Sequence, residues 1–164
     1  MLTPAQLATL KAHIAANTAT IQLGPDAVQI KDTPNNGDAN NEVAAWYNLQ
    51  ASPNYLIYRT TVPVAEVMLN GFDWTRVDNL SVGKARIWEW INQSGGFNPS
   101  KTNIRAGIDA CWTGTAPDLA VRAAVYVHCK RPASRLEKLF ATGSGTDASP
   151  SVMVVEGAIT YSDF

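Results

Sequence analysis

The sequence predicts a mainly α fold, with five to six helices, a minor β component and an extended C-terminal strand or arm. Three observations predict it. Apolar residues recur at helical spacing through most of residues 1–142, and Ser, Thr, Pro and Gly stand where such segments begin and end. Residues 143–150 read as a flexible linker, and residues 151–164 alternate like a strand. These ranges are the predicted helical core domain, linker and β arm.

The first helix is predicted over residues 3–16. Thr3 is a favourable cap, Pro4 fits the first turn, and three apolar residues share one face, namely Leu7, Leu10 and Ile14. Residues 20–30 carry β-branched side chains around a Gly-Pro break, which predicts short extended pieces. An Asn-, Pro- and Gly-rich loop is predicted to follow over residues 31–41.

A second helix is predicted from a cap at Asp38 or Asn40 to the Ser52-Pro53 step. Aromatic and β-branched residues then predict a strand over residues 55–62. A short helix is expected to run from Pro63 to near Gly71. The connection after it holds two rings that are expected to be buried, Phe72 and Trp74.

Three further helical segments complete the predicted core. Ser81 is the expected cap of the first, whose apolar stripe consists of Ile87, Trp88 and Ile91. Asn98-Pro99 is expected to begin the second, whose stripe consists of Ile104, Ile108, Cys111 and Trp112. Pro117 is expected to open the third, with Leu119, Ala120, Ala123, Ala124 and Val127 on its inner face. Pro132 is expected to kink this helix or begin another that runs to Phe140.

The composition excludes several classes of protein. With 46% hydrophobic residues, 16% charged residues and a net charge of −1, the chain does not read as disordered, collagenous or strongly basic. No apolar run is long enough to cross a bilayer, and the N-terminus lacks the features of a secretion signal, so we expect a cytosol-like compartment. The two cysteines, Cys111 and Cys129, are expected to be free thiols.

No motif for catalysis, a cofactor or a metal is present, and the sequence predicts a protein that is not an enzyme. His128 could serve as a base for Cys111 only if the fold brings the two together, and its neighbour Cys129 points about 100° away on a helix. The densest group of carboxylates, the alternative catalytic candidates, is Glu66, Asp73, Asp78 and Glu89. Caps and turns are the ordinary use of such residues.

A basic cluster precedes the linker and is opposed only by Glu137. Its members are Arg122, Lys130, Arg131, Arg135 and Lys138. The tail beyond it contains acidic residues and no basic ones. Three interpretations stay open for the cluster: a solvated helix face, a surface for an acidic partner, and a non-specific contact with DNA.

The end of the chain is the strongest candidate interface. Its apolar positions alternate, and the residues assigned to the interface are Met153, Val155, Ile159, Tyr161 and Phe164. A lone strand needs a sheet edge, which residues 55–62 or 20–30 of the same chain, or a neighbouring subunit, can supply. The linker favours the neighbouring subunit, and removal of residues 151–164 is then expected to leave the core domain folded.

Several stretches resemble a family of small proteins encoded in the structural-gene clusters of tailed bacteriophages and prophages. They are LTPAQLATLKAHIAA, YLIYRTTVPVAEVM with FDWTRV, NIRAGIDACWTG, and SRLEKLFATGSGTDASPSVMVVEGAITYSDF. The resemblance covers nearly the whole chain and implies a virion component. The predicted shape is similar to head-to-tail adaptor proteins, which form a ring under the portal and hold it through terminal extensions. No catalytic residue follows from the resemblance.

The expected protein is therefore a connector subunit at the head-tail interface of a virion, present in the host cytoplasm during assembly. Its expected partners are copies of itself in a ring, the portal protein, and tail or neck proteins, with no membrane contact. Two alternatives stay open: another virion subunit, such as a head decoration or minor tail protein, and a phage-encoded cell-wall hydrolase.

Overall fold

The structure, a computed structural model, describes residues 2–17, 37–69 and 72–164. The chain forms two compact units: unit 1 comprises Met1–Tyr55 and Pro132–Phe164, and unit 2 comprises Leu56–Arg131. This division differs from the predicted one, because the linker and the C-terminal segment belong to the same unit as the N-terminal helices. The described residues form seven α-helices and a small strand component, which confirms a mainly α fold.

Unit 1 is built from α1 (Pro4–Ala16), α3 (Gly37–Asn48), α8 (Arg135–Phe140) and the 3-10 turn η2 (Tyr161–Asp163). Thr3 and Gln6 form a capping box at the start of α1, as the sequence predicts for Thr3. The predicted caps of the second helix are wrong, since Asp38 and Asn40 lie inside α3. A second capping box joins Ser134 and Glu137 and starts α8 well after Pro132.

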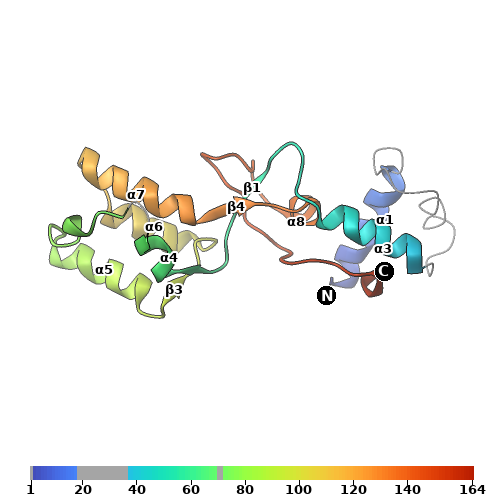
Figure 1. Cartoon of the computed structure of the whole chain (residues 1–164), viewed down its shortest axis with the longest axis horizontal. Coiled ribbons are helices and arrows are strands. Elements are labelled where there is room, and N and C mark those ends of the chain that lie inside the picture. Colours follow the sequence, from blue (N-terminus) through green and yellow to red (C-terminus); the bar gives the residue numbers. More distant parts are fainter. Residues whose placement is uncertain (1, 18–36, 70–71) are drawn as a thin grey trace. The chain divides into compact units, whose positions relative to one another are not determined.

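The core of unit 1 joins segments from both ends of the sequence. Its buried side chains are Leu10, Ile14, Val43, Ala44, Tyr47, Leu136 and Ile159. Figure 1 shows the C-terminal segment running back to α1 and α3, where the chain ends. The hydrophobic core of this unit therefore depends on residues from the last helix and from the C-terminal segment.

Unit 2 contains β1 (Leu56–Tyr58), β2 (Val62–Pro63), β3 (Gly96–Phe97) and most of β4 (Lys130–Pro132). β1 pairs with β4, and β2 pairs antiparallel with β3 so that Val62 faces Phe97 and Pro63 faces Gly96. The predicted strand over residues 55–62 is thus two short strands with different partners. Pro63 has no N–H to donate and ends the second of them.

Unit 2 also contains four helices and one 3-10 turn (Figure 1). They are α4 (Val64–Leu69), η1 (Trp74–Arg76), α5 (Val82–Asn92), α6 (Thr102–Cys111) and α7 (Ala116–His128). α6 begins after the predicted Asn98-Pro99 start. The predicted pieces at 20–30, most of the predicted loop at 31–41, and the helix end near Gly71 lie outside the described residues.

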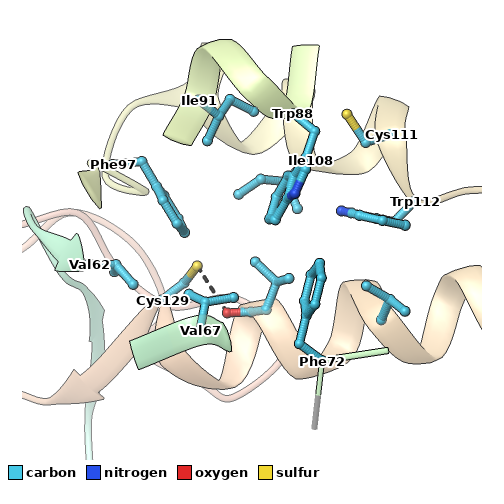
Figure 2. Close-up of a cluster of buried hydrophobic side chains, with 12 residues drawn as sticks. Val62, Val67, Phe72, Trp88, Ile91, Phe97, Ile108, Cys111, Trp112 and Cys129 are labelled. Atoms are coloured by element: carbon cyan, nitrogen blue, oxygen red, sulfur yellow. Dashed lines mark hydrogen bonds between the residues drawn. The ribbon is translucent and has the colours of Figure 1, made fainter. Parts of the chain in front are cut away.

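An aromatic cluster fills the core of unit 2 (Figure 2). The rings of Phe72 and Trp88 stack with centroids 5.6 Å apart, and Trp112 stands edge-on to Trp88 at 5.4 Å. The predicted stripes of α5 and α6 supply five of the twelve buried residues of this core: Trp88, Ile91, Ile108, Cys111 and Trp112. Trp74 was expected to be buried, but 57% of it is exposed, because it lies on η1 outside the cluster.

Candidate interaction sites

The C-terminal segment, residues 151–164, is not the predicted strand. It has bridge residues at Ser151 and Val152 and no longer strand. In one bridge Thr142 and Val152 exchange N–H to carbonyl hydrogen bonds of 2.9 and 3.0 Å. Gly157 has a φ of +100°, a conformation that breaks an extended strand and that favours glycine. The chain then ends in the 3-10 turn η2.

The C-terminal segment is bound by side chains of unit 1 and not by the edge of a sheet. Asn48 donates to the Ile159 carbonyl at 2.8 Å and accepts from the Ile159 N–H at 3.0 Å. The Glu137 carboxylate accepts from the Gly157 N–H at 3.4 Å. Ile159 is buried, whereas Val155 and Phe164 are half-buried against the same core.

The other two residues assigned to the predicted arm do not belong to this core. Met153 is half-buried and Tyr161 is exposed. The sequence left two partners open for this segment, its own chain and a neighbouring subunit. In the structure the segment folds back on its own chain. It folds onto helices rather than onto residues 55–62 or 20–30. Removal of residues 151–164 is therefore expected to open the core of unit 1, which reverses the expectation from the sequence.

The predicted linker is a packed loop. The Tyr55 hydroxyl donates to the Gly143 carbonyl at 2.9 Å and lies 2.6 Å from the Ser151 hydroxyl. Gly145 is buried with a φ of +66°, and a Cβ there would lie 2.2 Å from the Tyr55 ring. Only glycine fits this close approach. The loop thus joins α8 to the C-terminal segment along a defined path.

The five basic residues are divided between the two units. Arg122, Lys130 and Arg131 belong to unit 2, whereas Arg135 and Lys138 belong to unit 1. Arg122 lies 3.7 Å from the carboxylate of Asp109. Arg135 and Lys138 line a common cavity.

That cavity, the unit-1 groove, has a volume of about 560 Å³ and lies among α1, α3, the following loop and α8. Its lining includes His13, Trp46, Tyr47, Ser52, Arg135 and Lys138. The Arg135 guanidinium lies 4.1 Å from the centroid of Trp46. Burial raises the pKa of Tyr47 to about 12, so this phenol keeps its proton. Its hydroxyl forms a hydrogen bond of 2.6 Å with Nδ1 of His13.

A second surface lies on α7, where the prediction of the inner face is wrong. The helix buries Val121 and Val125, and Cys129 at its C-cap is also buried. The residues exposed on the opposite side are Ala116, Leu119, Ala120, Ala123 and Val127, which we call the outer face of α7. Leu119 is 41% exposed and Val127 is 63% exposed. The sequence signal was present, because an apolar residue occurs at nearly every turn on both sides of this helix.

Two of the four candidate catalytic carboxylates, Glu66 and Asp73, are in structural contacts. Glu66 accepts from Arg59 at 2.5 Å and lies 3.3 Å from Nδ1 of His128. The hydrogen bond from Arg59 holds the pKa of Glu66 below its usual value, with a smaller contribution from His128. Asp73 caps η1 by accepting from the Thr75 N–H at 3.0 Å. These are the ordinary uses of carboxylates that the sequence suggested.

The thiols have surroundings that disfavour the charged form. Cys111 and Cys129 are both fully buried, and Cys129 donates to the Val125 carbonyl at 3.3 Å (Figure 2). Burial raises the pKa of Cys129 to about 12 and that of Cys111 to about 11. Among the described residues, no group of three or more His, Cys, Asp and Glu could hold a metal ion.

None of the helices in the described ranges combines the length and the apolar character that a membrane span requires. Comparisons of the chain with protein-family models, with curated proteins and with solved structures found no match. The groove and the outer face of α7 are therefore interpreted from their own chemistry.

Proposed function

We propose that this chain is a structural subunit of a tailed-phage particle, and that it acts as a head-to-tail adaptor within a ring that joins the portal to the tail. The observation that carries the proposal is the apolar character of α7 on two opposite sides. The resemblance of four stretches of the sequence to phage structural proteins supports the same conclusion.

A helix that is apolar on both sides is normally covered on both sides. The core of unit 2 covers Val121 and Val125, whereas Leu119 and Val127 of the outer face are exposed to water. The three alanines of this face, Ala116, Ala120 and Ala123, have small side chains, so another protein surface can approach the backbone closely. Exposed apolar faces of this kind are typical of subunits that assemble.

In this proposal the outer face of α7 contacts a neighbouring subunit, while other surfaces contact the portal and tail or neck proteins. The basic residues of unit 2 supply an additional non-specific contact with DNA. The role is not enzymatic. Arg59 lowers the pKa of Glu66, whereas the acid of a glycoside hydrolase needs a raised pKa.

The proposal is tested on purified particles from a host that carries the gene. Mass spectrometry should detect the chain in the particles, and electron microscopy of particles with a gold-labelled chain should place it at the neck. Label over the capsid surface or along the tail would instead indicate a decoration or minor tail subunit. Absence of the chain from intact particles would contradict the proposal.

The hydrolase alternative has its own test. Zymography on cell walls should show no clearing by the purified chain, and Glu66→Gln and Glu89→Gln should change nothing. Lytic activity that is lost in either variant would favour the enzyme.

A further inference from the structure

The unit-1 groove holds two positive charges close together. Arg135 and Lys138 lie three residues apart on α8, which places them on neighbouring turns of one face. In the described part of the chain neither forms an ion pair, and no acidic side chain lines the groove. Two half-buried cations that have no counter-charge among the described lining residues make this lining complementary to an anion.

The geometry of Arg135 suits a carboxylate. Its guanidinium is stacked on Trp46, and Nη1 donates to the Trp46 carbonyl at 3.4 Å. Guanidinium groups have five N–H donors in a planar fork, so most of these donors are left for a ligand. The stacking restricts the plane of the fork before any ligand arrives, which lowers the entropy cost of binding.

The rest of the lining is apolar or neutral. Trp46, Tyr47 and Leu139 provide apolar surface, and Asn17 and Ser52 provide neutral polar groups. A volume of about 560 Å³ is that of a site for a few side chains rather than for a folded domain. The matching ligand therefore carries one or two carboxylates beside an apolar side chain.

The charge of unit 1 as a whole distinguishes a peptide from a nucleic acid. The ranges that make up unit 1 contain four Lys and Arg residues against eight Asp and Glu residues, a net charge of −4. A nucleic-acid strand presents a phosphate at every nucleotide and needs a cationic track beyond two residues. The excess of acidic residues repels such a polyanion, whereas a short acidic peptide interacts mainly with the local pair.

We propose that the unit-1 groove binds a short acidic segment of a partner protein, in which Asp or Glu contacts Arg135 and Lys138 and an adjacent apolar side chain contacts Trp46. This inference goes beyond the proposed function, because it concerns the ligand of the groove and holds for any complex that contains the chain. Its failure would leave the position of the chain in a particle untouched.

The test is selection of a yeast-displayed library of random decapeptides against the full-length chain. The enriched peptides should contain Asp or Glu next to an aromatic or aliphatic residue. Fluorescence polarisation with one enriched peptide should show binding at least about ten-fold weaker for Arg135→Gln and for Lys138→Gln. Lys11→Gln is the matched control, because it removes a positive charge from the exposed side of α1 in the same unit. This variant should bind the peptide with the affinity of the wild type.

Two further measurements sharpen the result. Circular dichroism shows whether each variant is folded. If Arg135→Gln is unfolded, the peptide affinity of Lys138→Gln alone decides whether the groove binds the peptide. A labelled oligothymidylate should bind more weakly than the peptide and should not displace it. No enrichment of acidic sequences, equal affinity in the folded groove variants, or displacement of the peptide by the oligonucleotide would overturn the proposal.

Discussion

Asn48 and Ile159 are 111 residues apart in the sequence, yet the side-chain amide of one forms two hydrogen bonds with the backbone of the other. The amide donates to the carbonyl and accepts from the N–H, as a neighbouring strand does in a sheet. One residue of α3 thus takes the role of the sheet edge that the alternating C-terminal sequence predicts. This pair explains why the segment folds back without forming a strand.

Asn48→Ala should loosen the C-terminal segment. Loss of two hydrogen bonds at a half-buried site costs about 1–3 kcal/mol, and the backbone of Ile159 would lose both partners. Hydrogen exchange followed by mass spectrometry should show faster exchange over residues 153–164 than in the wild type.

Ile159→Ala should lower the free energy of unfolding by about 2–5 kcal/mol, because it empties part of the unit-1 core. Unchanged exchange and stability in both variants would show that the segment does not fold back in solution.

Tyr55→Phe should destabilise the loop at residues 143–150. The hydroxyl bonds to the Gly143 carbonyl and to Ser151, so its removal should cost about 1–2 kcal/mol in urea unfolding. Tyr58→Phe is the matched control, because the contact of Tyr58 with Arg105 is made by its ring and not by its hydroxyl. The guanidinium carbon of Arg105 lies 4.4 Å from the centroid of this ring. Equal effects of the two substitutions would contradict the packed loop.

Both thiols should be unreactive in the folded protein. Burial raises the pKa of Cys129 to about 12 and that of Cys111 to about 11, so almost no thiolate exists at neutral pH. A chromogenic disulfide reagent should modify neither cysteine at pH 7.5 without denaturant and both in guanidinium chloride. Rapid modification of the native protein would instead indicate an accessible, activated thiol.

The ion pair of Asp118 should make stability depend on acid pH. Thr115 and Arg76 hold the pKa of Asp118 below its usual 3.8, with the Arg76 contact at 2.6 Å. A carboxylate with a depressed folded pKa stabilises the fold above its unfolded pKa, and that contribution is lost as pH falls through the folded value. The fall in unfolding free energy from about pH 5 to about pH 2 should therefore be smaller in Asp118→Asn. An identical pH profile would rule out this contribution.

Local patterns in the sequence predicted most of the helices correctly. The cap at Thr3, the position of Ser81 before α5 and the stripes of α5 and α6 depend on neighbouring residues, so the sequence alone reveals them. The Ser81 side chain makes no capping hydrogen bond, unlike that of Thr3. The fate of the C-terminal segment depends on Asn48 and Glu137, which are distant in sequence and carry no periodic signal. The inner face of α7 was also mispredicted, because both of its sides are apolar and periodicity cannot choose between them. The sequence did not predict the groove, because the residues of α1, α3 and α8 that line it are distant in sequence and meet only in the folded unit.

The most direct test of assembly through the outer face of α7 is sedimentation velocity of three versions of the full-length chain. Val127→Glu places a charge on this face, and Val154→Glu is the matched control, since the two valines are 63% and 62% exposed. We expect concentration-dependent oligomers for the wild type and for Val154→Glu, and a folded monomer for Val127→Glu. A wild-type chain that stays monomeric at high concentration, or a Val127→Glu variant that assembles as the wild type does, would contradict this expectation.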